Sequence, residues 1–394
     1  MEQLKIRFFV RISTATVLLL LTFFSSRAGA ESWFEHDQHT RSVTVMTQNM
    51  DAGTDLLYFF TPPADLLSDA SLTYGEVLQS DIPGRAATLA RIIARQQPDL
   101  ISLQEVTLWQ TVSADQKTSV LYDQLDLLLK ALKKLNKPYN VVISQTLSQG
   151  RLPVDPNLIG RPSDTTVAVD FTDRDVIIAR ADLKQSELEL SNAQTHLYGT
   201  LLTLPLGPSQ LTSKRGWLSV DATIRGNSLR FVNTHLETVI PAIPDTSLIQ
   251  AAQAKELVQV MSDTQAPIIL AGDFNADAEF AGIGPDQTDT PNIITNAGYT
   301  DSWKERHPIS HGFTWPLFLE DPIRPNPIGP FERIDLIYAR DLDVLDVYRV
   351  GNLLLDFADV LDIHSVGNFT LHLPSDHAGV VAKLLIDQQN DLHQ

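Results

Sequence analysis

Acidic, amide and imidazole side chains follow several apolar runs of this 394-residue chain, at the points where the runs stop. The segments are TQNMD at 47–51, LQE at 103–105, NTH at 233–235, GDFN at 272–275 and SDH at 375–377. Carboxylate and amide oxygens are the ligands that hard metal ions prefer, and a carboxylate with a histidine can move protons. The pattern therefore predicts a metal site combined with a general acid–base pair.

Asp273 and Asn275 lie two residues apart, directly after the apolar run 268–271. If the extended geometry continues, both side chains project to the same face. Asp273 would then take a proton from water, while Asn275 positions that water or donates to a phosphoryl oxygen. The alternative is that Gly-Asp-x-Asn forms a turn and caps the strand.

Asn49 and Asp51 repeat the two-residue spacing, and Glu105 ends another apolar run. Such oxygen ligands suit Mg²⁺, Mn²⁺ or Ca²⁺ and offer nothing for zinc without histidines. Each of them taken alone is more often a solvated strand end than a metal ligand.

Two histidines occupy motif positions. His377 follows Asp376, and a neighbouring carboxylate can hold an imidazole or share a metal with it. His235 follows Asn233 and supplies a second imidazole. A single histidine is more often structural, but two at such positions favour a functional role.

The first thirty residues have the order of a secretory signal peptide. Lys5, Arg7 and Arg11 are followed by a run of about ten mostly apolar residues at 15–24 and by Ala-Gly-Ala at 28–30. The run is shorter than the ~20 residues that span a bilayer, although an uncleaved anchor remains the alternative. We expect a secreted or periplasmic protein without a transmembrane segment in the mature chain.

The chain is acidic, with a formal net charge of −18, and removal of residues 1–30 takes away four positive and one negative side chain. Such acidity disfavours loose wrapping of nucleic acid, which relies on lysine and arginine. It does not exclude a metal-assisted nuclease, because bound cations cancel charge locally. With no cysteines, the chain must be stabilised by core burial alone.

Apolar patterns predict strands that alternate with helices. Residues 31–394 are therefore expected to form one α/β (α+β) domain, a four-layer sandwich of two face-to-face, mainly antiparallel sheets flanked by helices. Segments 51–83 and 316–330 are expected to be long loops. The strands are predicted at 43–47, 100–103, 141–143, 176–178, 218–224, 229–233, 268–270, 334–338 and 380–386, and the helices at 84–97, 121–135 and 246–262.

Seven segments, spread from about 43 to 386, carry a resemblance to a known family. They are QNMD (48–51), PDLISLQEV (98–106), NTHLE (233–237), ILAGDFNAD (269–277), GFTW (312–315), ERIDLIY (332–338) and PSDHAGVV (374–381). In this order they resemble the endonuclease/exonuclease/phosphatase superfamily of metal-dependent phosphoesterases. That superfamily includes deoxyribonucleases, abasic-site endonucleases, bacterial sphingomyelinases and inositol polyphosphate phosphatases.

The resemblance implies a set of metal ligands for Mg²⁺ (or Mn²⁺). Asn49 and Glu105 match ligand positions, with Glu105 the principal one, and Asp51 and Asp376 are candidates to join them.

It also implies catalytic roles. Asp273 matches the residue that activates water or protonates the leaving group, and Asn275 the amide that orients the phosphate. His377 matches the histidine that contacts the scissile phosphate, and Asp335 the carboxylate that orients it. His235 matches a second histidine of the deoxyribonuclease and sphingomyelinase branches.

One position departs from the pattern. The family often has a Gly-Asn-like segment near 175–180, whereas Asp175 stands in this chain, which leaves a substrate-side contact undetermined. The insertions at 51–83, 152–170 and 281–292 match no substrate-defining loop.

The expected function is hydrolysis of a phosphodiester in nucleic acid, phospholipid or a small molecule, with no stable protein partner. A nuclease is expected to have lysines and arginines on the loops around its site. Only scattered ones are found in this sequence, such as Arg151, Arg161, Lys214 and Arg215. A sphingomyelinase or phospholipase C-type enzyme would want exposed apolar runs, for which 56–60 and 315–319 are candidates. An inactive binding module on the same fold is the non-enzyme alternative.

Overall fold

The computed structural model describes residues 42–54, 65–206, 209–241, 243–280, 288–317, 330–352 and 373–386. From Val43 onward these residues belong to one compact unit. The expected signal peptide at 1–30 and the apolar run 56–60 lie outside the described residues.

The first sheet has eight strands in the spatial order β15–β16–β1–β2–β6–β3–β4, with β5 also paired to β6. β1 and β2 are parallel, while β6 is antiparallel to β2, β3 and β5. The strands are β1 (Ser42–Asn49), β2 (Leu100–Gln104), β3 (Leu108–Ser113), β4 (Thr118–Asp123), β5 (Tyr139–Pro153), β6 (Thr166–Arg180), β15 (Leu342–Val350) and β16 (Gly379–Ile386).

The second sheet has six strands in the order β13–β14–β12–β11–β10–β7, and β8 with β9 makes a separate hairpin. Only β11 and β12 are parallel among the pairs of the second sheet that the structure describes. The strands are β7 (Leu188–Leu197), β8 (Leu202–Leu206), β9 (Ser209–Ser213), β10 (Gly216–Ile224), β11 (Asn227–His235), β12 (Ile268–Asp273), β13 (Thr300–Asp301) and β14 (Asp335–Arg340).

The inner faces of the two sheets share one apolar core. Val45, Leu100 and Ile177 of the first sheet pack in a cluster with Val220 and Phe231 of the second, and all five side chains are fully buried. Where alternate residues of a strand point to this core, a shift of one residue would expose them, which fixes the register of the central strands.

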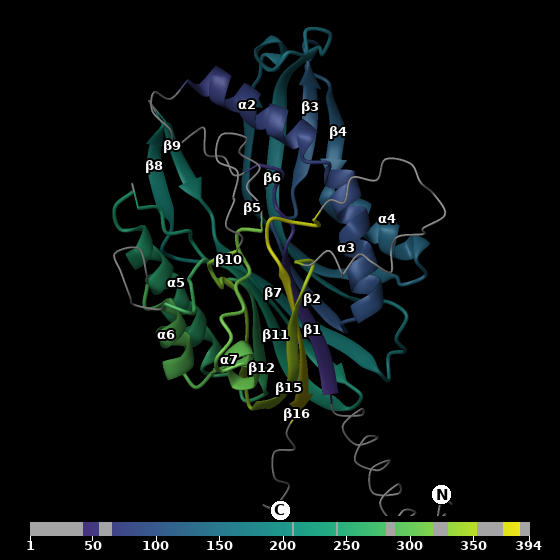
Figure 1. The fold of residues 1–394 in the computed structure, drawn as a ribbon, viewed down its shortest axis with the longest axis vertical. Coiled ribbons are helices and arrows are strands. Elements are labelled where there is room, and N and C mark those ends of the chain that lie inside the picture. The colour runs from purple at the N-terminus through teal and green to yellow at the C-terminus, as the bar shows by residue number, and fades with distance from the viewer. Residues whose placement is uncertain are drawn as a thin grey trace, which may run out of the picture. The chain divides into compact units, whose positions relative to one another are not determined.

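Helices cover the outer faces. Leu89 of α3 and Leu128 of α4 pack with Ile101 on the first sheet, and Leu257 of α5 packs with Leu270 on the second. In Figure 1, α3 and α4 accordingly lie on the opposite side of the strands from α5 and α6. The predicted four-layer sandwich is confirmed. The helices are α2 (Leu66–Gln79), α3 (Ile82–Gln96), α4 (Gln124–Lys134), α5 (Thr246–Met261), α6 (Thr290–Asn296), α7 (Ser302–Arg306) and the 3₁₀ helix η2 (Pro156–Ile159).

Two predicted segments differ in the structure. The expected loop at 51–83 contains helix α2, whose first turn is capped by the Asp65 carboxylate and whose Tyr74 and Val77 are buried. The helix expected from 121 begins only at Gln124, because residues 118–123 pair with β3 as β4 and Asp123 caps the helix. Tertiary pairing and capping thus override the apolar periodicity there.

The strands predicted at 218–224 and 229–233 are confirmed as β10 and β11, which form a hairpin. Ile224 pairs with Asn227, so the two turn residues are Arg225 and Gly226. Both have positive φ, at 49° and 87°, which is the geometry of a tight two-residue turn.

The close approach of β11 and β12 makes Gly272 a sensitive position. A Cβ at this residue would lie 2.0 Å from the Thr234 carbonyl oxygen. We expect Gly272→Ala to lower the free energy of unfolding by about 1–3 kcal/mol, as overpacking does. Gly150→Ala is the control, because nothing lies within 4 Å of a Cβ there. Urea denaturation of the two variants measures the difference, and equal stabilities would contradict the packing described.

Candidate active site

Strand ends from both sheets converge at one rim. Asn49 pairs with Gln104 where β1 and β2 end, and Glu105 follows directly. On the second sheet Asp273 pairs with His235 on one side and with Asp335 on the other. Polar residues that follow separate apolar runs in the sequence therefore lie close together in the structure.

Asn49 connects the two sheets at this rim. Its Nδ2 donates to Glu105 Oε1 at 2.9 Å and to Asp273 Oδ2 at 3.0 Å. Glu105 has a φ of 52°, a left-handed conformation that turns its side chain off the strand direction. Non-glycine residues in this region cost free energy and cluster at functional sites.

Glu105, His235 and Asp273 form the first candidate metal group. One ligand atom of each lies within 4.8 Å of the others. Two carboxylates and an imidazole suit a divalent cation that accepts oxygen ligands and tolerates one nitrogen. Asn49, an expected ligand, contacts both carboxylates of this group through its Nδ2. Asp51 and Asp376, the other expected ligands, are not members of it.

Asp273 also belongs to a second group, with Asp335 and His377. His377 Nδ1 lies 2.9 Å from Asp335 Oδ2 and 4.0 Å from Asp273 Oδ2. Burial and the neighbouring Asp335 raise the pKa of Asp273 to about 7. Burial works to lower the pKa of His377, but Asp335, Asp376 and Asp273 together raise it well above its ordinary value.

Asp376 lies next to His377 and is close enough to Asp51 and Glu105 for their charges to raise its pKa. Its Oδ2 accepts a hydrogen bond from Trp315 Nε1 at 3.0 Å, and its Oδ1 is 3.8 Å from His377 Nε2. Burial, partly offset by His377, raises the pKa of Asp376 to about 7.

Asp51 and Asn275 point differently from the simple strand-end expectation. The Asp51 Oδ2 lies 3.1 Å from Arg85, and its Oδ1 accepts from the Gly53 backbone N–H. Asn275 has a φ of 49°, so the extended geometry stops at Asp273 and the predicted common face is not formed. Instead, the Asn275 backbone N–H donates to Asp273 Oδ1 at 2.8 Å, the turn geometry of the alternative interpretation.

His235 is held by a residue that sequence reasoning counted only as a scattered cation. Nη1 of Arg215 lies 2.8 Å and 3.0 Å from the two ring nitrogens of His235. Burial, Arg215 and His377 lower the pKa of His235 well below its ordinary value. A neutral imidazole is the form that can bind a metal.

Several other polar residues at the rim were not singled out from the sequence. Gln104 Nε2 donates to Asn233 Oδ1 at 2.8 Å and so bridges the sheets. Glu237 lies 3.6 Å from Arg215. Glu237 and Asn233 fall inside the NTHLE segment, which was the available signal, whereas nothing local to Arg215 distinguishes it from an exposed arginine.

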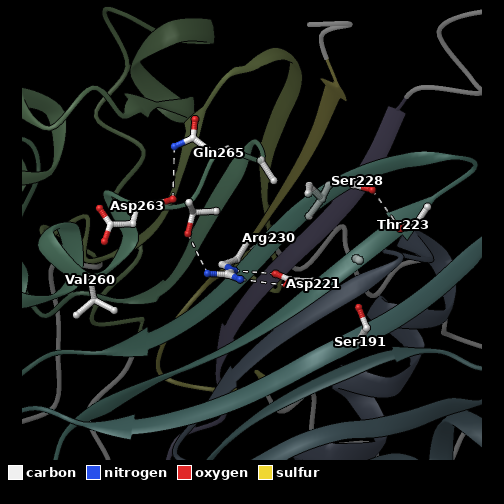
Figure 2. Close-up of a pocket in the computed structure, with 12 residues that line it drawn as sticks. Ser191, Asp221, Thr223, Ser228, Arg230, Val260, Asp263 and Gln265 are labelled. Atoms are coloured by element: carbon white, nitrogen blue, oxygen red, sulfur yellow. Dashed lines mark hydrogen bonds and ion pairs between the residues drawn. The ribbon is translucent and has the colours of Figure 1, made fainter.

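A polar hollow with a volume of about 490 Å³ lies at the other end of the second sheet. Its lining includes Asp221 and Arg230 near the start of β11, whereas His235 ends that strand. Figure 2 shows Arg230 directed at Asp221, and the closest distance of this ion pair is 2.7 Å. The arginine is thereby neutralised, and no residue of the rim lines this hollow.

The apolar run expected at 315–319 is described only in part. Trp315 is half-buried and bonded to Asp376, and Pro316 is buried. Residues 318 and 319 lie outside the described ranges. Within those ranges, no helix has the length and apolar character needed to cross a membrane.

Solved structures with a similar fold are distant in sequence. An endonuclease/exonuclease/phosphatase from Beutenbergia cavernae is 19% identical, with 88% of this chain and 72% of that chain covered and a TM-score of 0.49. A family protein from Leptotrichia buccalis is 17% identical, with 87% and 99% covered and a TM-score of 0.47. D. rerio TDP2, complexed with single strand DNA product, is 15% identical, with 87% and 98% covered and a TM-score of 0.48.

A search among curated proteins finds no match for this chain. The sequence model of the Endonuclease/Exonuclease/phosphatase family, by contrast, matches residues 46–377. This span contains every residue of the rim described above, from Asn49 to His377. The chain therefore belongs to the Endonuclease/Exonuclease/phosphatase family.

Proposed function

We propose that this protein hydrolyses phosphodiester bonds with the help of a divalent metal ion, Mg²⁺ or Mn²⁺. Hydrolases of its family act on phosphoester bonds. The observation that carries the proposal is that Asp273 belongs both to the candidate metal group and to the group with His377. A metal ligand set and a proton-handling pair thus meet at one carboxylate.

Glu105 and His235 would hold the metal, and Asp273 lies within reach of it as the group that moves the proton. Once bound, a divalent cation would stabilise negative charge that develops on the phosphoryl oxygens. Glu105 is half-buried, Asp273 is buried and the two lie close together, so a cation also offsets their mutual repulsion.

Asp273 is the proposed acid–base group. In the metal-free chain, burial and Asp335 raise the pKa of Asp273 to about 7, which makes this carboxylate the one of the rim best suited to exchange a proton near neutral pH. Asn49 Nδ2 and the Asn275 backbone N–H fix its two oxygens. Asp273 would thus accept the proton of the attacking water, or deliver one to the leaving oxygen.

His377 is the proposed electrostatic partner of the phosphate. Its raised pKa favours the charged imidazolium, and Asp335 Oδ2 at 2.9 Å fixes the Nδ1 side of the ring. A charged Nε2–H can then donate to a phosphoryl oxygen. Asp335 is accordingly a positioning residue, because it acts through His377.

The substrate is left open between a small phosphodiester, a nucleic acid and a phospholipid. Arg151 forms an ion pair with Asp170, and Arg161 forms one with Asp164. These two arginines are therefore not free to bind nucleic-acid phosphates, which gives no support to the nuclease. Assays on plasmid DNA, RNA, sphingomyelin and a nitrophenyl phosphodiester would separate the candidates. Binding without turnover on all four would favour the non-enzyme alternative.

We also propose that residues 1–30 direct export and are removed near Glu31. The support is the order of basic, apolar and small residues in that segment. N-terminal sequencing of protein from the periplasm or medium checks this, and a cytoplasmic chain that starts at Met1 would contradict it.

Turnover should stop in chelator and return with Mg²⁺ or Mn²⁺. We expect Glu105→Gln to raise the metal concentration needed for half-maximal activity and to cut turnover, because it removes a charged ligand while keeping the side-chain shape. Asp221→Asn, with the same charge change far from the rim, is the control. Full activity in excess chelator, or zinc bound stoichiometrically in purified protein, would contradict a Mg²⁺ or Mn²⁺ enzyme.

Asp273→Asn and His377→Ala should each lower kcat by roughly 10²–10⁴-fold, the usual contribution of acid–base groups. Asp273→Asn should not lower the thermal stability, whereas His377→Ala should, because it leaves the buried Asp335 carboxylate without its partner. The double variant should lose far less than the product of the two losses, because the two residues act on one reacting centre. A near wild-type kcat for Asp273→Asn on a validated substrate would rule out this mechanism.

The metal-free chain should lose stability as the pH rises from 6.5 to 8. The raised pKa values of Asp273 and His377 mean that the folded chain binds more protons than the unfolded chain in this range, so stability falls with pH. His235, with its lowered pKa, acts in the opposite direction, but only as the pH falls below about 6.5. Thermal melts in chelator measure the trend, and Asp273→Asn should flatten it. A flat or rising profile for the wild type would contradict the assignment.

A further inference from the structure

Trp315 lies next to the proposed phosphate-binding histidine. Its ring centroid is 6.2 Å from that of His377, and its Nε1 donates to Asp376 Oδ2 at 3.0 Å. The same ring lies 6.2 Å from that of Phe331, with an angle of 71° between the two planes. An indole that is fixed by a hydrogen bond therefore connects His377 to a second aromatic ring.

Phe331 presents its ring to solvent from a chain segment that is held in place. Its side chain is 47% exposed, although it contacts Trp315. The backbone N–H groups of Phe331 and Glu332 both donate to the Trp315 carbonyl at 3.0 Å, and the Trp315 N–H donates to the Glu332 carbonyl at 3.0 Å. The exposed ring thus has a fixed position beside the catalytic rim.

Glu332 adds a negative charge to the two aromatic rings. It stands directly opposite Trp315 in an antiparallel bridge, so both side chains project to the same face. Glu332 is half-buried, and no hydrogen-bond donor, lysine or arginine among the described residues contacts its carboxylate. Burial, Asp277 and Asp273 raise the pKa of Glu332 to about 7, since His377 offsets the negative charge only in part.

These three residues have the features that bind a cationic group of a ligand. The face of an aromatic ring attracts a positive charge, and several rings at an angle to one another are typical of sites for quaternary ammonium groups. The methyl groups of such a cation also gain free energy when they leave water for an aromatic surface. A positive charge beside Glu332 would compensate a carboxylate that the protein itself leaves without a cationic partner.

Nucleic acid fits the same residues less well. Successive bases stack on aromatic faces, and two rings whose planes differ by 71° cannot both lie parallel to stacked bases. The carboxylates of Glu332 and Asp376 would also repel the phosphates that flank the scissile one. The formal net charge of −18 acts in the same direction.

We propose that Trp315, Phe331 and Glu332 bind a quaternary ammonium group of the substrate while His377 contacts its phosphate. The inference rests on the proposed function and deepens it, because it names the substrate class, a phosphodiester of choline. The positive charge of choline lies a short chain away from the phosphate, in agreement with the close approach of Trp315 to His377. Phospholipid head groups and soluble choline phosphodiesters share this chemistry. Phe331 and Glu332 are accordingly specificity-determining residues.

A matched pair of ligands tests the role of the positive charge without any need for turnover. Phosphocholine and neohexyl phosphate have the same shape, but only phosphocholine carries a quaternary nitrogen. By calorimetry, the mature chain in saturating Mn²⁺ should bind phosphocholine roughly 10-fold more tightly, the size expected for cation–aromatic contacts. Equal affinities for the two ligands would overturn the proposal.

Two variants separate the aromatic and the carboxylate contributions. Glu332→Gln and Phe331→Leu should each reduce the preference for phosphocholine by about threefold or more. Phe331→Leu keeps an apolar side chain and removes the aromatic face, and it also serves as the test should Glu332→Gln not fold. Glu189→Gln is the control, because it makes the same charge change on β7 opposite Thr223, which lines the hollow at the other end of the sheet. A wild-type preference in both Glu332→Gln and Phe331→Leu would overturn the assignment.

Hydrolysis assays identify the source of the choline group. Water would add to phosphorus, the bond from phosphorus to the other alcohol oxygen would break, and that oxygen would take up a proton, so that phosphocholine is released. Turnover of sphingomyelin vesicles or of glycerophosphocholine would support the proposal, and the faster of the two would indicate a lipid or a soluble source. A higher kcat/KM on plasmid DNA than on both would overturn it.

The outcome is separable from that of the proposed function. Preferential binding of phosphocholine by a chain that hydrolyses no phosphodiester would overturn the proposed function and leave the binding inference intact. Hydrolysis of a nitrophenyl phosphodiester by a chain with equal affinities for the two ligands would do the reverse.

Discussion

Repulsion among carboxylates buried at one rim of the sandwich is the constraint on which the rest of the site depends. Glu105, Asp273, Asp335, Asp173 and Asp175 are brought to this rim by strands of both sheets. In an apolar interior each additional ionised carboxylate raises the cost of the others. Three things offset this repulsion. Amide groups and arginines donate hydrogen bonds to the carboxylates, raised pKa values allow some of them to keep a proton, and a bound cation, as we propose, would supply positive charge.

A polar frame holds these groups in place. Asn233 Nδ2 donates to the carbonyls of Leu103 and Val176, so a single amide ties β11 to two strands of the first sheet. Arg85 donates to the Met50 carbonyl and pairs with Asp51, which fixes the turn after β1. Asp51 thus has a clear structural partner, whether or not it also contributes to a metal site.

A second polar network lies next to Asp335. Arg333, two residues before it, is almost fully buried and forms ion pairs with Glu279 and Asp301, each with a closest distance of 2.7 Å. Its backbone N–H donates to Asp277, two residues beyond Asn275. The turn that carries Asp273 and Asn275 and the start of β14 are therefore held by one network, which keeps Asp273 in register with Asp335. Buried ion pairs contribute little net free energy to folding, so we expect this network to fix the geometry of the site more than it raises the free energy of unfolding.

The central strands and several residues of the candidate site could be predicted from the sequence. Apolar runs that end in polar residues identified the central strands, and Asn49, Glu105, Asp273, Asp335 and His377 all lie at the rim. Helix α2 and strands such as β3, β4, β7 and β15 were not predicted. Most side chains of β4 and β7 are at least partly exposed, so these two strands have no strong apolar pattern.

The sequence by itself determined which side chains end strands, because strand periodicity and its interruption are local properties of the chain. Only the tertiary structure decided which of them meet. The left-handed turns at Glu105 and Asn275 redirect side chains that extended geometry would have sent elsewhere. Pairing between strands far apart in sequence places Arg215 against His235 and Asp175 behind it. Charges that look scattered or exposed along the chain become buried partners, since electrostatic effects depend on distance and burial in space rather than on separation in sequence.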